Sequence, residues 1–302
     1  MGDSTRPTHK RHQAKTAFAV SLVAFLFASA AHATQPKNPS APEAPAATLS
    51  EPPETTSIAA VGPGDEGIEL SGRFTQSSMN YAKGIDWEVK NSLGEVLYRG
   101  ADEVAAVKLA PGAYELLATY GNVHIDEALT LPPQAHINVN FVLNAGALRV
   151  LPRLKGLEQP VPPSYTRVFA VNGKDNGKLV ASSRQPGEIL KLAAGTYRVE
   201  TEFEGGNVAS STTIEVKAGI IRSIDIDHHA GLLHLTWPGT APAESWTVND
   251  TETGGTTTLP ATVSDLALKP GHYVLQADVG GKRLRKELNI SEGETAALAL
   301  GE

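Results

Sequence analysis

The chain has 302 residues, an apolar content of 41%, an aromatic content of 6% and a formal net charge of −7 at pH 7. An acidic chain of this kind is a poor candidate for binding nucleic acid or anionic lipid surfaces. It contains no cysteine, which excludes disulfides, a lipid anchor on cysteine and a cysteine nucleophile. The length corresponds to about two domains of average size, or to more if they are small.

The first 33 residues are typical of a cleavable signal peptide. Four basic residues up to Lys15 precede an apolar run of 15 residues at 17–31, and Ala31-His32-Ala33 fits the small-x-small cleavage pattern. We expect cleavage after Ala33, because the run is short for a bilayer span; an uncleaved anchor is the alternative. Cleavage leaves 22 basic and 32 acidic residues, a net charge of about −10.

Residues 34–65 carry seven prolines in 32 positions and no apolar periodicity. Such a composition cannot bury a core, so we expect a disordered or extended linker. Its simplest role is that of a spacer. If the signal stays uncleaved, the linker becomes a tether to the membrane.

The rest of the chain is an internal repeat. Its main marker is a turn that leads into a strand with a tyrosine: Leu109-Ala110-Pro111-Gly112-Ala113-Tyr114, Leu192-Ala193-Ala194-Gly195-Thr196-Tyr197 and Leu268-Lys269-Pro270-Gly271-His272-Tyr273. An aromatic residue precedes each tyrosine by 27 or 28 positions: Trp87, Phe169 and Trp246. A glycine hairpin follows each tyrosine strand, and a further turn, at Pro132-Pro133, Gly219 and Gly293, precedes the last strand.

Apolar and polar residues alternate along these segments, as in a strand with one buried face. We count about seven strands in each unit, and no helical period is sustained after residue 65. The sequence therefore predicts an all-β chain of three tandem, seven-stranded antiparallel β-sandwiches, either Ig-like or prealbumin-like. The expected boundaries are 66–144, 145–228 and 229–302.

The Pro-Gly step predicts a type II turn in which glycine takes a positive φ. We expect each tyrosine to be a core ring whose hydroxyl reaches a nearby backbone group. Trp87, Phe169 and Trp246 stand at matching positions and are expected in the core as well.

The Leu-x-Pro-Gly-x-Tyr pattern and the tandem arrangement resemble the exported bacterial modules known as carboxypeptidase-regulatory-like, PEGA-like or Cna-B-like repeats. That resemblance implies spacers, adhesive stalks or accessory modules with a prealbumin-like or Ig-like fold. It covers residues 66–302. The Lys-Asn isopeptide triplet common in the Cna-B type is not recognisable here, and no sortase signal is present.

One cluster of residues could bind a metal. Asp225, Asp227, His228 and His229 lie at the junction of the second and third units, and such side chains can ligate zinc. The alternative is a polar joint between sandwiches, because Asp225 and Asp227 share the polar side of a strand. No cofactor is otherwise indicated.

Trp237 is the aromatic residue most suited to contact a ligand, because the other units have no aromatic at its position. Tyr81 and Tyr165, in or near long loops, come next. No P-loop, dinucleotide-binding motif or serine nucleophile elbow occurs, so an enzyme is not expected.

The sequence therefore favours a non-catalytic structural or interaction protein of the cell envelope, periplasmic or secreted, in a Gram-negative cell. We expect it to bind a protein partner through sandwich loops or edges. A glycan- or peptidoglycan-binding module is the first alternative, and a metal-dependent enzyme is the second. The oligomeric state does not follow from the sequence, and membrane insertion is expected only with an uncleaved signal.

Overall fold

The computed structural model describes residues 54–158, 162–237, 245–279 and 281–299, so the expected signal peptide lies outside the described residues. In this part the chain is almost entirely β, with one short 3-10 helix at Gly173–Asp175. No helix among the described residues is long and apolar enough to cross a membrane. The all-β prediction is confirmed.

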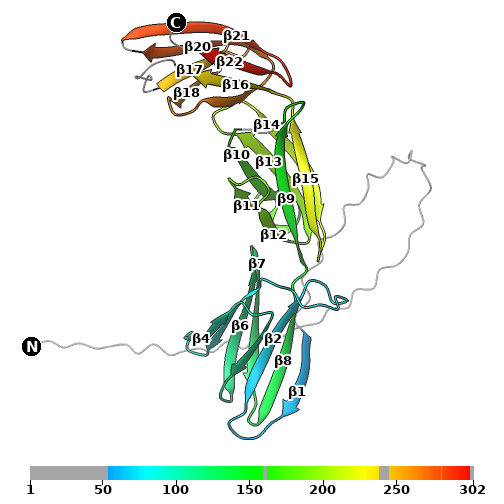
Figure 1. Cartoon of the computed structure of the whole chain (residues 1–302). Coiled ribbons are helices and arrows are strands. Elements are labelled where there is room, and N and C mark those ends of the chain that lie inside the picture. Colours follow the sequence, from blue (N-terminus) through cyan, green and yellow to red (C-terminus); the bar gives the residue numbers. More distant parts are fainter. Residues whose placement is uncertain (1–53, 159–161, 238–244, 280, 300–302) are drawn as a thin grey trace, which may run out of the picture. The chain divides into compact units, whose positions relative to one another are not determined.

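The strands form six sheets, two for each of three sandwiches (Figure 1). The first sandwich contains β2 (Gly67–Arg73), β3 (Asp86–Asn91), β4 (Val96–Gly100), β5 (Val104–Lys108), β6 (Gly112–Tyr120), β7 (Val123–Leu131) and β8 (Ala135–Val142). The second contains β9 (Ala145–Leu154), β10 (Ser164–Ala170), β11 (Leu179–Ser183), β12 (Ile189–Ala193), β13 (Gly195–Phe203), β14 (Ala209–Val216) and β15 (Ile221–His228). The third contains β16 (Gly231–Thr236), β17 (Ser245–Asp250), β18 (Thr256–Pro260), β19 (Asp265–Leu268), β20 (Gly271–Val279), β21 (Lys282–Ile290) and β22 (Thr295–Ala299).

All three sandwiches share one topology. One sheet has the order β4-β3-β6-β7 in the first sandwich, β11-β10-β13-β14 in the second and β18-β17-β20-β21 in the third. The other sheet places the first strand between two neighbours, as in β12-β9-β15 and β19-β16-β22. In every sandwich the first and last strands pair in parallel, for example β9 with β15, so the prediction of purely antiparallel sheets is wrong at this pair.

The predicted tyrosine position is confirmed in each sandwich. The hydroxyl of each tyrosine donates to the carbonyl oxygen four residues earlier, at 2.5 Å for Tyr114, 2.8 Å for Tyr197 and 2.8 Å for Tyr273. Burial raises the pKa of Tyr197 and Tyr273. These hydrogen bonds fix the ring over the start of its own strand.

The predicted type II turn before each tyrosine is wrong. Gly112, Gly195 and Gly271 do not have a positive φ, and each is the first residue of its strand. A Cβ built on Gly195 would meet the Tyr197 ring at 3.8 Å, which is ordinary contact. Glycine is therefore not demanded here by backbone conformation.

Two of the three matched aromatics are in the core, and the third is not. Trp87 and Trp246 are 2% and 0% exposed and lie opposite Ala118 and Ala277, four residues after their tyrosines. In the second sandwich that place belongs to Thr166, opposite Thr201. Phe169 lies on the outer face, where the Arg198 guanidinium carbon is 4.5 Å from the ring centroid.

The predicted linker contains a strand. Strand β1 (Glu54–Ala60) pairs antiparallel with β8, and extends the sheet of the first sandwich to the order β1-β8-β2-β5 (Figure 1). Its pairs include Ile58 with Ile137 and Ala60 with Ala135. The expectation of an unstructured segment is therefore wrong for residues 54–60.

Candidate interaction site

The four residues of the expected metal site do not converge. On β15, Asp225 and Asp227 face the solvent while His228 faces the core and is 2% exposed. Asp225 forms an ion pair with Arg153 at 3.1 Å, and His229 contacts Glu292 at 2.9 Å. In the described part of the chain, no group of three or more His, Cys, Asp or Glu side chains could hold a metal ion.

His228 is a core residue. Its Nε2 lies 2.8 Å from the hydroxyl oxygen of Thr201, and its ring meets Phe203 edge-on at 4.9 Å between centroids. Its buried Nδ1 has no hydrogen-bond partner. Burial lowers the pKa of His228 to about 4, against a smaller opposing effect of Asp227, so the ring is neutral at pH 7.

The predicted ligand contacts Trp237 and Tyr81 lie in different settings. Trp237 follows β16, is partly buried and packs against the core of the third sandwich, so it is not an exposed platform. Tyr81 is 39% exposed, and the Arg73 guanidinium carbon lies 5.6 Å from its ring centroid. The structure does not bring these two side chains together with Tyr165.

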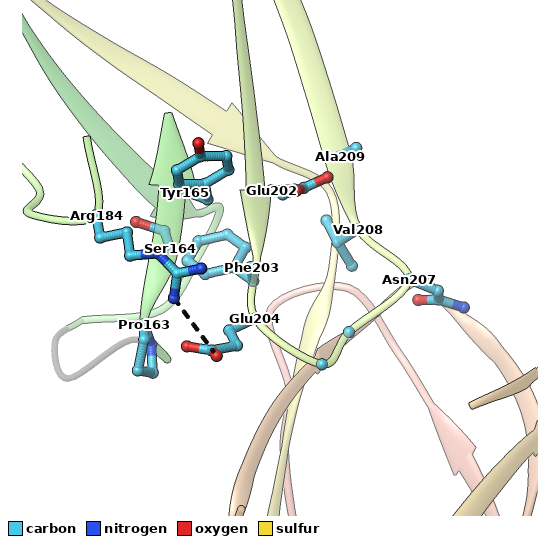
Figure 2. Close-up of a pocket in the computed structure, with 12 residues that line it drawn as sticks. Pro163, Ser164, Tyr165, Arg184, Glu202, Phe203, Glu204, Asn207, Val208 and Ala209 are labelled. Atoms are coloured by element: carbon cyan, nitrogen blue, oxygen red, sulfur yellow. Dashed lines mark ion pairs between the residues drawn. The ribbon is translucent and has the colours of Figure 1, made fainter. Parts of the chain in front are cut away.

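Tyr165 lines a hollow of about 520 Å³ on the outer face of the second sandwich (Figure 2). It lies on β10 opposite Glu202 of β13, so the two side chains point to the same side of the sheet. The guanidinium carbons of Arg167 and Arg184 lie 5.6 and 5.4 Å from its ring centroid, within the range of cation–π attraction.

Two ion pairs border this hollow. Arg184 contacts Glu204 at 3.9 Å, and both side chains line the hollow (Figure 2). Arg167 contacts the lining residue Glu202 at 2.9 Å. Arg184 and Glu204 are 77% and 61% exposed, so their pairing contributes little to stability and can rearrange around a ligand. The lining offers the Tyr165 ring, the Arg184 guanidinium and two carboxylates, which suits a polar ligand.

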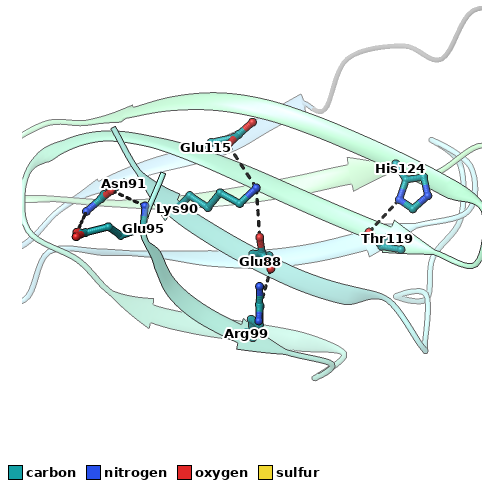
Figure 3. Close-up of polar contacts among 8 residues, drawn as sticks. All are labelled: Glu88, Lys90, Asn91, Glu95, Arg99, Glu115, Thr119 and His124. Atoms are coloured by element: carbon teal, nitrogen blue, oxygen red, sulfur yellow. Dashed lines mark hydrogen bonds and ion pairs between the residues drawn. The ribbon is translucent and has the colours of Figure 1, made fainter. Parts of the chain in front are cut away.

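The first sandwich has a hollow of similar size at the equivalent place, lined by Asp86 and Thr119 among others. Asp86 pairs with Thr119 as Tyr165 pairs with Glu202, so an aspartate stands where the second sandwich has its tyrosine. Glu88 and Arg99 also line this hollow and belong to a network of charged residues, in which Glu88 contacts Arg99 at 2.6 Å and Lys90 at 3.2 Å (Figure 3). The hydrogen bond from Arg99 lowers the pKa of Glu88. The aromatic residue in the lining of this hollow is Trp87, which is 2% exposed, so the exposed ring that Tyr165 supplies in the second sandwich has no counterpart here.

The edge of the second sandwich at β15 is a feature that sequence reasoning missed. The corresponding edge of the first sandwich, β8, is covered by β1, whereas among the described residues β15 has only β9 as a neighbour in its sheet. Ile220 and Ile221, at the start of this edge, are 51% and 59% exposed. An unpaired strand edge with exposed apolar side chains is a template for adding another strand.

The backbone of β15 shows which groups are free to bind. The Ala147 N–H donates to the Ile220 carbonyl at 2.9 Å, and Ala147 is the parallel partner of Ile221. In a parallel pair of strands, a residue such as Ala147 forms its hydrogen bonds with the residues before and after its partner, here Ile220 and Arg222. Arg222 and the alternate residues after it therefore bond to β9. The N–H groups of Ile221, Ser223, Asp225 and Asp227 consequently point to the open edge.

No protein-family model and no curated protein matches the chain. Among solved structures, the Bacillus anthracis TIE protein is 16% identical with a TM-score of 0.27, over 80% of this chain and 50% of that one. The minor pilin GBS52 of Streptococcus agalactiae is 11% identical (TM-score 0.28; 54% of this chain, 95% of that one). The shaft pilin SpaA of Lactobacillus rhamnosus GG is 12% identical (TM-score 0.31; 57% and 97%). The chain thus spans half the length of the first of these, and at such TM-scores the matches carry no argument about function.

Proposed function

We propose that the chain is a non-catalytic structural or interaction protein exported to the bacterial cell envelope, which binds a protein partner through the β15 edge of its second sandwich. The observation that carries this proposal is the difference between two equivalent edges. An extended segment of the chain itself covers β8, whereas β15 starts at two exposed isoleucines, Ile220 and Ile221, and has free backbone donors.

Other features support the proposal. The N-terminal segment has the composition of an export signal, and it fits a periplasmic or secreted protein of a Gram-negative envelope. The titratable cluster around His228 serves packing and ion pairs rather than chemistry. We take residues 66–144, 145–228 and 229–302 as the three repeats of this protein.

Capture of a partner by the exported form of the chain tests this function. The comparison is between the unaltered chain and Ser223→Pro, which removes one free N–H on the open edge and keeps the bonds to β9. Ser223→Thr, which keeps the N–H, is the matched control. We expect a protein to be retained by the unaltered chain and by Ser223→Thr, and lost with Ser223→Pro. Equal retention by all three forms would contradict binding through this edge.

A second candidate function is glycan binding at Tyr165. It is favoured by the hollow of about 520 Å³ with an aromatic ring among charged side chains. The test is the binding of purified peptidoglycan fragments to the unaltered chain and to Tyr165→Ala, with Tyr81→Ala as control. Loss of binding with Tyr165→Ala alone would support this function. Retention of the chain on cell-wall polymer without any protein partner would contradict the leading proposal.

A further inference from the structure

We propose that the partner of the β15 edge is strand β21 of a second copy of this chain, so that copies join edge to edge into an open-ended assembly. This inference rests on the proposed function and names its partner. It follows from the free backbone groups, the side-chain faces and the charges of the two strands.

Both strands lie at the edges of their sheets. Strand β15 ends the order β12-β9-β15, and β21 ends the order β18-β17-β20-β21. The first sandwich shows that a strand is accepted at the position of β15, because β1 pairs antiparallel with β8 there. We therefore consider an antiparallel addition of β21 to β15.

The free backbone groups of β21 alternate like those of β15. The Thr251 N–H donates to the His272 carbonyl oxygen at 3.0 Å, so His272 and the alternate residues after it bond to β17. The residues between them, up to Val279, bond to β21, and Val279 pairs with Lys282. Lys282, Leu284 and the alternate residues after them therefore bond to β20. The backbone groups of Arg283, Arg285 and Glu287 point to the open edge.

One register satisfies the backbone and the charges together. It places Asp225 opposite Arg285 and Asp227 opposite Arg283, and all four residues have their backbone groups directed to the open edges. Both aspartates and both arginines are exposed on the outer faces of their sheets. Opposite charges in directly facing positions stabilise a strand pair.

The remaining pairs of this register are compatible with it. Ile226, on the inner face of β15, lies opposite Leu284, which is partly buried and packs against the core of the third sandwich. Ser223 lies opposite Glu287, whose carboxylate can accept a hydrogen bond from the serine hydroxyl. Lys286 lies opposite Ile224 and has to extend its ammonium group to solvent.

The neighbouring registers fail. A shift of two residues in one direction places Asp225 opposite Glu287, which is a pair of like charges. A shift in the other direction places Asp227 beyond the start of β21, opposite Gly281 in the hairpin. Only one register therefore pairs both aspartates with arginines.

Charge also explains the selectivity of the pairing. Edge strands rich in lysine and arginine resist pairing with themselves, and β21 has four basic residues among its first five. The same charges favour an acidic partner. The ion pairs that these side chains make within one chain are exposed, with Arg285–Glu287 at 3.0 Å and Arg153–Asp225 at 3.1 Å, so they can exchange partners at small cost.

Because each copy offers one β15 edge and one β21 edge, the contact is head-to-tail and continues from copy to copy. We expect the exported form of the chain to associate with rising concentration, and association to weaken by about tenfold or more when salt screens the two charge pairs. Sedimentation velocity over a wide concentration range at low and high salt measures both.

Two charge-reversed variants make the test specific. Asp225→Arg/Asp227→Arg has two basic edges, and Arg283→Asp/Arg285→Asp has two acidic edges, so each alone should lose association. A mixture of the two restores both complementary contacts and should associate like the unaltered chain. Asp126→Arg, a reversal on the exposed edge strand β7, is the control and should associate normally.

A separate variant tests the prediction that the free backbone N–H groups of β15 form the contact. Ser223→Pro should abolish association at any salt concentration, and Ser223→Thr should not. Circular dichroism verifies that each variant is folded. If a β15 variant does not fold, Arg283→Asp/Arg285→Asp on β21 still tests the contact. A chain that stays monomeric, associates regardless of salt, or is not restored in the mixture overturns this inference. If that chain still captures another protein through Ser223, the proposed function stands without it.

Discussion

In the second sandwich, close packing against backbone atoms requires a glycine at Gly146 but not at Gly195. A Cβ on Gly146 would lie 2.2 Å from the Lys217 carbonyl oxygen and 2.9 Å from that of Ile220. The turn before β15 therefore packs directly on Gly146, and Gly219 in that turn has a φ of +74°. The third sandwich repeats this arrangement with Gly231 and Gly293.

In the first sandwich, a glutamate side chain rather than a glycine contacts the turn before the last strand. Glu66 is at the position of Gly146, and its carboxylate accepts from the Gln134 N–H at 3.1 Å and the Gly64 N–H at 2.7 Å. Backbone hydrogen bonds lower the pKa of Glu66. Gln134 itself has a φ of +55°, where the other repeats use glycine.

We expect Gly146→Ala to destabilise the second sandwich by about 2 kcal/mol or more, because backbone atoms must move to admit the new methyl group. Gly195→Ala should change the free energy of unfolding by less than about 1 kcal/mol, since its φ is ordinary and its Cβ would make normal contact. Urea unfolding of both variants measures the difference. Equal destabilisation would mean that Gly195 is needed for a turn after all.

His228 makes stability depend on pH. The pKa of about 4 in the folded chain lies below the value of 6.5 for a free imidazole, so the unfolded chain binds the proton more readily. The stability contributed by the neutral ring is complete above pH 6.5 and is lost as pH falls toward 4. We expect a loss of about 1 to 2 kcal/mol between pH 7 and pH 5.

The double variant His228→Leu/Thr201→Val tests this source of pH dependence. In the first sandwich the equivalent residues are Leu143 and Ala118, both buried and apolar. The variant removes the unpartnered Nδ1 as well as the hydroxyl, so it should be as stable as the unaltered chain at pH 7 or more so. Unfolding curves at pH 7 and pH 5 that show the same loss in both forms would contradict this role of His228.

At the scale of elements, strand β1 explains why β8 is not an edge. Residues Ala135, Ile137 and Val139 of β8 are 5%, 2% and 2% exposed, although Ile58 of β1 is itself 63% exposed. The gain from β1 therefore lies mainly in backbone pairing and in covering β8, and less in the burial of its own side chains.

Ala59→Pro should detach β1, because the Ala59 N–H faces β8 in its pair with His136, and proline cannot donate that hydrogen bond. We expect faster amide hydrogen exchange in β8 and a modest loss of stability, of about 1 to 2 kcal/mol. Ile58→Ala is the control and should leave exchange in β8 unchanged, because the side chain is mostly exposed. Unchanged exchange in Ala59→Pro would mean that β1 does not protect β8.

The sequence predicted the local elements better than their partners. Alternation, the tyrosine marker and the glycine hairpins identify the strands of each repeat, because these signals lie within a few residues. The parallel pairing of first and last strands joins segments about 70 residues apart, as Ile68 with Ile137, and leaves no local signal.

Two errors have definite physical causes. The strand β1 was hidden by the prolines of its segment, yet these lie at Pro52, Pro53 and Pro63 and leave residues 54–60 free of proline. Phe169 was misplaced because spacing to the tyrosine ignores loop length. Thr166 holds the core position, and a shift of three residues turns a side chain to the opposite face.

At the scale of the whole molecule, the repeated topology makes differences between repeats informative. The sandwiches share their strand order and tyrosine hydrogen bond, so the residues that vary at equivalent places mark individual roles. Of the residues predicted for a site, Tyr165 lines a hollow, and His228 is buried in the core rather than grouped with other metal-binding side chains. The site prediction from sequence missed the β15 edge, because an open edge depends on which strands pair across the chain.

Amide hydrogen exchange in β15 tests the central claim, that this edge is the binding strand. In dilute protein, β15 should exchange faster than β8, which is paired on both sides. On association or on binding of a protein partner, protection should rise at Ile221, Ser223, Asp225 and Asp227, whereas β8 stays the same. A β15 that is as protected as β8 in dilute protein, or that gains no protection when bound, would contradict the account.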